Sequence, residues 1–567
     1  MSAGPPVVVP FGDRALLVST PDVAAAHALA ARVADARGGG RAPADVEEVV
    51  VGFATVLVVV GPHPDGADLA EAAGWLEGLA TEPAHRSGAD PAEVHHLPVT
   101  FDGPDLDEAA GRAGLTREEV VRLLVGADLT VALVGFAPGF PYLTGLPPAL
   151  AALPRRASPR TSVPAGSVAI AGGFAAVYPR ATPGGWLLLG RTNVSLFDPE
   201  RPPHSLVAPG DRVRFHVAGA SPADPGGSGD GGARRSGGSR PRLAHRGRLA
   251  LEVLDPGLLS LVQDGGRTGT GGLGVPRAGA ADPRALDLAN RLVGNRPDDA
   301  AVEGTATGPT VRVVGGGLVA VVAGGPGAVD VGVDGHPVPD GAVVPVDDGQ
   351  VVTVGPVRRG LRAYLAVAGG LRTPVVLGSR SSDVLTGLGP GPLRPGDRLA
   401  RGEPGRARGR LDMPPGADGG TVRLRVLPGP HARGDDGRGD AGYHRLTATS
   451  WRVGGDVDRI GVRLEPADGA AGSGPAPRGS VPMVTGAVQV PPDGRPVVLL
   501  PDHATVGGYP VVACVISADL HRLGQLRPGD AVELEPVGQA DAVAALTRSR
   551  ETAATRVSGW FPTAAAT

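Results

Sequence analysis

The hydrophobic and polar positions of the N-terminal region alternate between strand-like and helix-like spacing. Val7–Ser19 and Val46–Val60 are rich in branched apolar residues and predict strands. Between them, Thr20 predicts a helix N-cap, with Pro21 at the first helical position. Apolar residues at helical spacing from Leu69 onward predict a second helix. This region is therefore expected to form a small α+β module.

The rest of the chain is predicted to consist mainly of short strands joined by turns. Thr116 and Glu119 form a T-x-x-E capping box before a helical apolar stretch. Three Pro-Gly-Asp turns, starting at Pro209, Pro395 and Pro528, each precede a short alternating strand. In such a turn proline fixes φ at the second position and glycine allows a positive φ at the third. The pattern predicts a β-rich α+β fold built from barrels or sandwiches.

One long segment without hydrophobic periodicity divides the chain. Residues 218–247 are rich in Gly, Ser, Pro and Arg, which predicts a disordered linker. It separates a first half, made of the module at 1–90 and a β-rich region at 91–217, from a second half at 248–548. Residues 549–567 are expected to form a tail. The length of 567 residues agrees with several domains.

The composition indicates a large core with many turns. Hydrophobic residues make up 42% of the chain, while glycine (90) and proline (58) are frequent. The net charge of −4 and an aromatic content of 3% do not support nucleic-acid binding. No stretch reaches about 18 uninterrupted apolar residues, and the N-terminus lacks the pattern of a signal peptide. We therefore expect a cytoplasmic protein that does not insert into a membrane.

The chain contains no lysine, so all 54 basic residues are arginine. A Walker-A loop, a Schiff base with pyridoxal phosphate and a covalently attached biotin each need a lysine, so this chain can carry none of them. The single cysteine, Cys514, excludes an internal disulfide and a multi-cysteine metal site. The histidines show no metal-ligand spacing, and no metal site is expected.

An aromatic loop at Val134–Leu143 is the first candidate for ligand binding. Phe136 and Phe140 are interleaved with Pro138 and Gly139, which exclude a helix and a central strand. Such a rigid loop could present aromatic faces and backbone N–H groups to a ligand. The alternative is a hydrophobic plug that closes one end of a barrel.

Several arginines next to glycine-rich turns could hold phosphate or carboxylate groups. Arg191 follows one such turn, and Arg267 shares the segment QDGGR with Asp264. Arg277 lies in a glycine-rich loop that enters a helix at Asp282, where an anion could bind. The alternatives are solvated arginines paired with carboxylates and glycines that serve turn geometry alone.

A polar loop after the apolar strand at residues 497–500 is the third candidate. It contains Asp502, Thr505, Gly507, Gly508 and Tyr509. Reacting groups are often placed on loops that follow a buried strand. Asp502 could orient a base or an amide, and its neighbours could contact the substrate.

These segments, in this order, resemble the two subunits of the allophanate hydrolase-like pair. The first half carries GFAPGFPYL (135–143), VPAGSVAIAG (163–172), PGGW (183–186), GRT (190–192) and LFDP (196–199). The second half carries QDGGR (263–267), GVPRAGAAD (274–282), ANRLVGN (289–295), YLAVAGG (364–370), GSRSSD (378–383), GAVQVPPDG (486–494), GGYP (507–510) and ISADLHRLGQLRPGD (516–530). The resemblance covers nearly the whole chain outside the linker.

The resemblance implies cyclophilin-like β-barrels in both halves and a fused pair of accessory subunits, B and C, of bacterial ATP-dependent 5-oxoprolinase. That system opens the lactam of 5-oxo-L-proline to L-glutamate together with a separate third subunit. ATP, with Mg, would activate the lactam oxygen by phosphorylation, and the two halves would associate into an oligomer. The alternatives are a carboxyltransferase component of a urea carboxylase-like system that borrows biotin from another chain, and a non-catalytic regulator that binds a kinase.

The resemblance also assigns expected roles to the candidate residues. Asp502 is expected to contact the lactam, and Arg267 and Asp264 to act with it in catalysis. Arg191, Arg267 and Arg277 are expected to contact phosphate or carboxylate.

The chain departs from its relatives at several polar positions. Relatives usually have Gln-Thr-Gly at Phe174–Ala176, and Ser-Asp-Arg where this chain has Val457–Arg459. Near Asp502, relatives usually carry Gln, Thr and Lys where this chain has Ala504, Val506 and Val511. These changes predict an altered substrate or weaker catalysis if the positions touch substrate.

Overall fold

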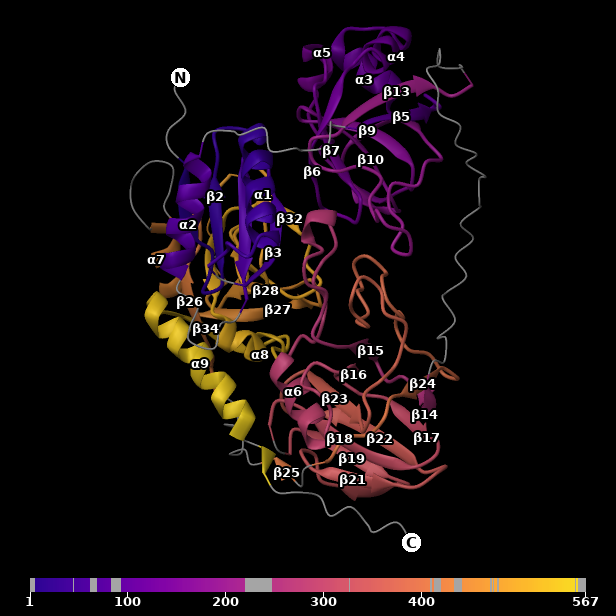
Figure 1. Ribbon diagram of the computed structural model, residues 1–567, viewed down its shortest axis with the longest axis vertical. Coiled ribbons are helices and arrows are strands. Elements are labelled where there is room, and N and C mark those ends of the chain that lie inside the picture. The colour runs from indigo at the N-terminus through magenta and orange to yellow at the C-terminus, as the bar shows by residue number, and fades with distance from the viewer. Residues whose placement is uncertain are drawn as a thin grey trace.

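The computed structural model describes most of the chain (Figure 1). The described residues are 6–43, 45–61, 69–82, 93–219, 247–325, 327–407, 410–411, 420–432, 441–469, 472, 474–476, 479–555 and 557–558. The predicted linker at 218–247 lies almost entirely outside them. Within the predicted tail at 549–567, the described part contains the end of a helix and a short strand.

An antiparallel sheet forms the N-terminal module, with strand order β1-β2-β4-β3. Its elements are β1 (Val7–Pro10), β2 (Ala15–Ser19), α1 (Val23–Gly38), β3 (Val46–Val51), β4 (Thr55–Val60) and α2 (Leu69–Thr81). Alternate residues such as Leu16 and Val58 pack under the two helices. Their neighbours Leu17 and Leu57 pack against the second half of the chain. The sheet is therefore buried on both faces.

The start of α1 differs from the sequence-based expectation. The N-cap is Asp22, whose carboxylate accepts a hydrogen bond from the backbone N–H of Ala25 at 2.8 Å. Thr20 was the predicted N-cap, but its hydroxyl donates to the carbonyl of Asp22 instead. The prediction of Thr20 as N-cap and Pro21 as first helical residue was wrong because Asp22 supplies the capping oxygen, so the helix begins at Val23 and Pro21 precedes the cap.

A seven-stranded sheet rolls up into a barrel in the rest of the first half, with order β12-β9-β10-β7-β6-β13-β5. A bridge between Thr100 and Arg191 links its two edge strands. The strands are β5 (Val94–Val99), β6 (Leu129–Val134), β7 (Pro141–Thr144), β9 (Ser167–Ala171), β10 (Phe174–Val177), β12 (Leu187–Arg191) and β13 (Arg212–Val217). The accompanying elements are α3 (Leu106–Ala113), α4 (Arg117–Val125), α5 (Pro148–Ala151) and the pair β8 (Arg160–Val163) and β11 (Thr182–Gly184).

The second half begins with two sheets that pack around a shared apolar core. The six-stranded sheet contains β20 (His336–Val338), β19 (Val329–Val333), β22 (Val351–Val357), β17 (Thr310–Val313), β14 (Arg248–Asp255) and β24 (Arg398–Arg401). The five-stranded sheet contains β15 (Leu259–Gln263), β16 (Ala301–Thr305), β23 (Arg362–Val367), β18 (Gly317–Val322) and β21 (Val343–Val346). Helix α6 (Pro283–Leu292) packs on the outer face of the five-stranded sheet, after the short helix η1 (Gly271–Leu273).

A closed barrel completes the second half, with order β26-β33-β30-β31-β28-β27-β34. Its strands are β26 (Val422–Pro428), β27 (Trp451–Val457), β28 (Gly461–Pro466), β30 (Ala487–Gln489), β31 (Val497–Leu499), β33 (Val511–Val515) and β34 (Ala531–Pro536). Around it lie α7 (Ala441–Ala448), η2 (Ser517–Asp519), α8 (Leu520–Leu523), α9 (Gln539–Thr555), the pair β29 (Val481–Pro482) and β32 (Val506–Gly507), and the pair β25 (Arg410–Leu411) and β35 (Val557–Ser558).

The two barrels have the same topology. In the first, β13 runs parallel to β5 and antiparallel to β6; in the second, β34 runs parallel to β26 and antiparallel to β27. The last strand of each barrel follows a Pro-Gly-Asp turn, whose glycine has φ of 98° at Gly210 and 91° at Gly529. The third such turn, at Gly396, precedes β24. The predicted β-rich α+β fold, with a barrel in each half and an N-terminal α+β module, is confirmed.

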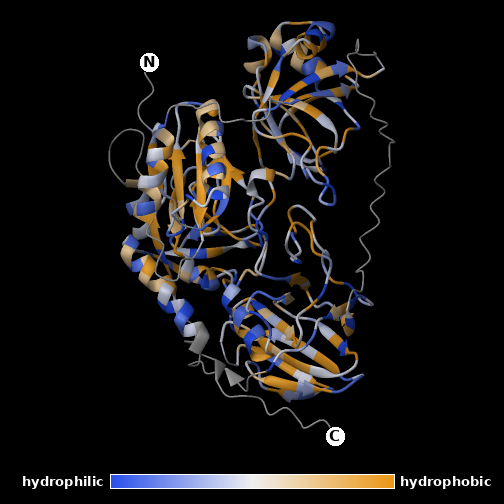
Figure 2. Cartoon of the chain, viewed as in Figure 1, coloured by the Kyte–Doolittle hydropathy of each residue, from blue (hydrophilic) through white to orange (hydrophobic). Residues whose placement is uncertain are grey.

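The apolar residues lie inside these sheets, and the helices turn polar faces outward (Figure 2). Other local predictions also agree with the structure. Thr116 and Glu119 form the predicted capping box of α4, and Asp282 caps α6 with Pro283 in the first turn. Within the described part of the chain, no helix has both the length and the apolar character needed to cross a membrane.

Replacing Thr116 with alanine removes the side-chain oxygen that accepts from the Glu119 N–H at 3.2 Å. We expect α4 to lose about 1 kcal/mol of local stability. Amide hydrogen exchange in its first turn should therefore accelerate about fivefold. Thr116→Ser, which keeps the oxygen, should exchange like the wild type; equal rates in all three proteins would contradict this assignment.

Candidate functional site

A buried ionic network joins the two packed sheets of the second half, called the sandwich below, to the barrel of that half. The Arg459 guanidinium donates to both oxygens of Asp502, at 3.0 and 2.9 Å, and to Glu303 on β16. It also donates to the carbonyl of Gly279. All three charged side chains are at most 2% exposed. Because a buried charge without a partner is strongly disfavoured, each of these groups holds the others in place.

Arg459 and Glu303 stay charged because the attraction between the opposite charges outweighs the cost of removing them from water. Burial alone would lower the pKa of Arg459, but the charges of Asp502 and Glu303 raise it above its usual value. Burial would raise the pKa of Glu303, but Arg459 and Arg362 hold it below its usual value. Tyr364 donates its hydroxyl to Glu303 at 2.7 Å, and burial together with Glu303 raises the pKa of that tyrosine.

Asp383 lies beside this network, and the pKa of its carboxyl group is shifted toward neutral pH. Its oxygens accept from the N–H groups of Leu385 and Thr386 and from the Thr386 hydroxyl. Burial, and secondarily the charge of Asp502, raises the pKa of Asp383 to about 6. A carboxyl group with such a pKa can exchange a proton near neutral pH, as a general acid or base must.

Equivalent loops of the two barrels contact the turn that contains Asp383. Asp502 is the third residue after β31, and its Oδ2 accepts from the N–H of Val384 at 3.0 Å. Arg180 is the third residue after β10, and its Nη2 lies 3.8 Å from where a Cβ on Gly387 would be. The turn is therefore held between the two halves of the chain.

Two of the predicted catalytic residues, Asp264 and Arg267, support the neighbouring segment. Asp264 accepts from the hydroxyls of Ser379 and Ser381, each at 2.6 Å. Arg267 is 1% exposed and donates to the carbonyls of Val376 and Ser381. Burial lowers the pKa of Arg267, and the Asp383 charge opposes that shift. Its Nη1 is buried and has no hydrogen-bond partner in the described part of the chain.

A cavity of about 480 Å³ opens next to these loops, between the N-terminal module, α6, the second barrel and α9. Three predicted site residues line it: Asp264, Arg277 and Thr505. Arg277 pairs with Glu47 of the N-terminal module at 3.0 Å, so the wall is built by both halves. Its volume lies in the range of about 300–1,000 Å³ that is typical of small-molecule sites.

Thr505 is the predicted residue best placed to meet a ligand. It is 5% exposed, it lines the cavity, and its hydroxyl has no partner among the described residues. Gly507 belongs to β32, and a Cβ there would lie 2.7 Å from Nε2 of Gln489, so a larger residue would displace the end of that side chain. Gly508 follows it, and Tyr509 is 43% exposed.

The predicted aromatic loop packs into the protein. Its residues 134 and 141–143 belong to β6 and β7, interior strands of the seven-stranded sheet, so the predicted exclusion of a central strand was wrong: Pro141 is the first residue of its strand, where proline is tolerated. Phe140 is 2% exposed and contacts the rings of Phe136, Tyr142, Tyr178 and Trp186.

The backbone of that loop reaches the second half. The N–H of Gly139 donates to the carbonyl of Leu273 at 2.9 Å. Phe136, Pro138, Gly139 and Phe140 are not among the residues that line the cavity.

Arg191 is placed apart from the other candidates. Its side chain is 62% exposed and pairs with Asp102 at 2.9 Å on the first barrel. It does not line the cavity. In the described residues, no group of three or more His, Cys, Asp or Glu side chains could hold a metal ion.

None of the three polar-to-apolar departures near Asp502 lines the cavity. Val511 is fully buried between the second barrel and the N-terminal sheet. Val506 packs in the aromatic cluster of the first barrel, and Ala504 accepts a hydrogen bond from the His503 ring. The two valines therefore stabilise apolar contacts between the halves.

Sequence reasoning missed Arg459, Glu303, Asp383 and Arg180 as parts of this region. The sequence did contain a signal for two of them: Arg459 lies in a segment that departs from relatives, and Asp383 ends the matching segment GSRSSD (378–383). Glu303 sits in an apolar strand, where its burial with two arginines could not be foreseen.

Arg459→Met should leave Asp502 and Glu303 as unpaired buried carboxylates. Removal of one partner from a buried ionic network costs about 3–5 kcal/mol, so the calorimetric unfolding midpoint should fall by at least about 6 °C. The matched control is Arg423→Met in the same barrel, where an exposed pair with Glu533 contributes about 0–1 kcal/mol. Similar midpoints for both variants would contradict the network's role.

Asp383→Asn should change how stability depends on pH. The folded-state pKa of about 6 exceeds the usual value of 3.8, so ionisation of the wild-type carboxyl opposes folding as pH rises between these values. The free energy of unfolding of the wild type relative to the variant should therefore fall by up to about 3 kcal/mol between about pH 4 and pH 7. Asp456→Asn, at a side chain 86% exposed, is the control. A pH-independent difference for Asp383→Asn would refute the shift.

Comparison with known proteins agrees with this division of the chain. Residues 6–207 match the family model for the carboxyltransferase domain, subdomains C and D, and residues 273–536 match the model for subdomains A and B. The 5-oxoprolinase B subunit of Escherichia coli O157:H7 is 43% identical over 177 residues, covering 30% of this chain and 78% of that protein.

One further relative covers the second half, and a solved structure covers nearly the whole chain. The 5-oxoprolinase C subunit of Escherichia coli strain K12 is 34% identical over 291 residues, covering 50% of this chain and 89% of that protein. The crystal structure of TTHA0988 matches with a TM-score of 0.77 at 34% identity, covering 94% of this chain and 99% of that one. The chain therefore belongs to the carboxyltransferase-domain family, with subdomains C and D in its first half and subdomains A and B in its second.

Proposed function

We propose that this chain is a fused pair of accessory subunits, B and C, of an ATP-dependent 5-oxoprolinase. The observation that carries the proposal is that one chain is similar to both named subunits, each over most of that subunit's length. The loops of the two halves also meet, at Glu47 with Arg277 and at Gly139 with Leu273. A fusion would keep the two subunits at a fixed ratio around one site.

The chemistry of the site supports a small polar substrate. Thr505 offers a buried hydroxyl to the cavity, and Asp383, which lies in the turn bonded to Asp502 and not in the cavity lining, has a pKa raised by burial to about 6. A lactam is a poor electrophile, so ATP would supply the phosphoryl group that activates its oxygen. Asp502, Arg267 and Asp264 would then act mainly by positioning the loops around the substrate, since their side chains are bonded to other parts of the protein.

A carboxyltransferase component is the second candidate function, because both family models describe carboxyltransferase subdomains. In that case biotin would have to come from another chain, since this one has no lysine to carry it. The two functions differ in their partner: a third 5-oxoprolinase subunit for the first, and a biotinylated carrier for the second.

A coupled assay tests the proposal. The full chain, the cognate third subunit, Mg-ATP and 5-oxo-L-proline are mixed, and glutamate and ADP are measured. Stoichiometric formation of both products supports the proposal. No turnover, together with no binding of 5-oxoproline by calorimetry, would refute it, and carboxyl transfer from a biotinylated carrier to urea would favour the second candidate.

Thr505→Val should lower kcat/KM in this assay while leaving the fold intact. The change keeps the side-chain volume and removes a hydroxyl that no described residue uses, so a loss of about three- to tenfold reports a contact with the ligand. Thr353→Val, at an exposed position of β22, is the matched control. Equal kcat/KM values for the two variants would show that the Thr505 hydroxyl does not contact the ligand.

A further inference from the structure

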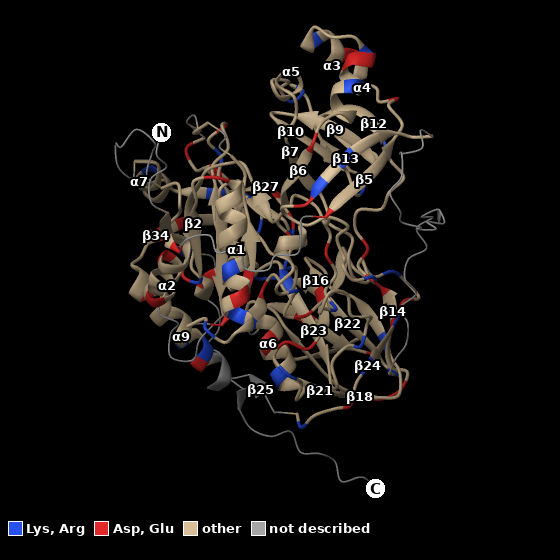
Figure 3. Cartoon of the chain, turned by 45° about the horizontal axis from the view of Figure 1, so that its top comes forward, with Lys and Arg blue, Asp and Glu red and all other residues tan. Residues whose placement is uncertain are grey.

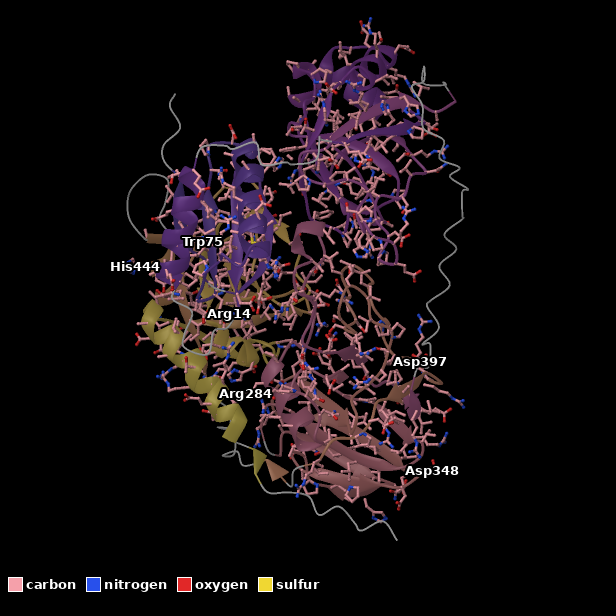
Figure 4. All side chains as sticks on the ribbon, in the orientation of Figure 1. Arg14, Trp75, Arg284, Asp348, Asp397 and His444 are labelled. Atoms are coloured by element: carbon pink, nitrogen blue, oxygen red, sulfur yellow. The ribbon has the colours of Figure 1, made fainter. Side chains whose placement is uncertain are left out.

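The cavity has a second charged wall, whose residues have no role assigned above. Away from the Asp502 loop, its lining includes Arg14 of the N-terminal module, Arg284 at the start of α6 and Arg550 on α9. Figure 4 labels Arg14 at the lower end of the N-terminal sheet and Arg284 below it, and both side chains border the same cavity. Three separate elements therefore bring guanidinium groups to one space.

Two of these arginines form no ion pair among the described residues. The side chain of Arg550 also forms no hydrogen bond within the described part of the chain. Arg284 has one side-chain contact, its Nη1 to the Nε2 of His521 at 3.2 Å. Partial burial lowers the pKa of Arg550, and the nearby charge of Arg14 lowers it further, against smaller opposing effects of Glu47 and Asp13. Like charges brought together in this way favour an anion between them.

The carboxylates that line the same cavity have partners of their own. Asp264 accepts from two serine hydroxyls, and Asp298 lies 3.7 Å from Arg296. Asp13 accepts from the N–H and hydroxyl of Ser517, and burial raises its pKa. Glu48 accepts from the N–H of Gly271, and burial raises its pKa as well. Asp287 pairs with Arg291 on α6. These groups therefore oppose an incoming anion less than free carboxylates would.

A smaller cavity of about 200 Å³ continues the basic surface along α8 and α9. It shares Arg284, His521 and Ser549 with the larger one and adds Arg548, whose side chain forms no hydrogen bond or ion pair with the described residues. Figure 3 shows that basic and acidic residues are otherwise interspersed over the molecule. The grouping of unpaired arginines is thus a local feature.

We propose that the larger cavity binds the phosphate groups of a phosphorylated small molecule, held by Arg284 and Arg550. Several guanidinium groups around one cavity favour a multiply charged anion. The planar guanidinium can donate two parallel hydrogen bonds to a pair of phosphate oxygens. The apolar part of the lining, which includes Phe11, Met483 and Leu546, would receive the uncharged part of the ligand. The identification of that ligand as ATP rests on the proposed function above.

Calorimetric titration of the full chain tests the proposal with ATP, pyrophosphate and adenosine as probes. ATP and pyrophosphate should both bind, and adenosine should bind at least about tenfold more weakly than ATP. Arg284→Gln and Arg550→Gln should each weaken the binding of both phosphate compounds at least about tenfold, since each removes charged hydrogen bonds. Tighter binding of ATP than of pyrophosphate would identify a nucleotide, and equal affinities would identify a phosphate site alone.

The control is Arg312→Gln, an exposed arginine that pairs with Glu252 on the sandwich; it should bind both probes like the wild type. Circular dichroism and unfolding midpoints verify that the variants fold. The proposal is overturned if the wild type binds neither phosphate compound, or if both cavity variants bind them unchanged. ATP-dependent turnover with unchanged ATP binding in both variants would overturn this inference alone, whereas phosphate binding without turnover would overturn the proposed function alone.

Discussion

The contact of Arg459 with Asp502 and Glu303 is the interaction on which the candidate site depends. Arg459 and Asp502 belong to the second barrel, and Glu303 belongs to the five-stranded sheet, so one guanidinium joins two domains. Since none of these charges can be left unpaired in the interior, the domains have one favourable arrangement. That arrangement brings Val384 into hydrogen-bonding distance of Asp502 and so positions the Asp383 turn.

The site is composite because neither half contains all of its walls. The N-terminal module contributes Glu47 to Arg277 of the second half, and its sheet packs against the second barrel through Val511. The first barrel adds Arg180 beside the Asp383 turn and an aromatic cluster around Val506. The apolar replacements at these positions thus lie at contacts between halves, where a buried polar group would need a partner.

Local sequence chemistry predicted most of the elements but little of the site's electrostatics. The capping box at Thr116 and the Pro-Gly-Asp turns act within a few residues, so their effect could be read from the chain. Thr20 failed as a predicted cap because Asp22 offered a competing oxygen two residues later. Arg267 and Asp264 were identified as important, yet the structure shows them supporting a segment more than a hundred residues away.

The sequence by itself determined the β-rich architecture, the division into two halves, and the absence of any lysine-based chemistry. Only the tertiary structure decided which charges meet. Arg459 and Glu303 are 156 residues apart, and Arg277 and Glu47 are 230 apart. Turn and cap preferences arise from neighbouring backbone groups, whereas the pairing of distant charges follows from how whole sheets pack and exclude water. That packing also gathers the arginines of three elements around one cavity.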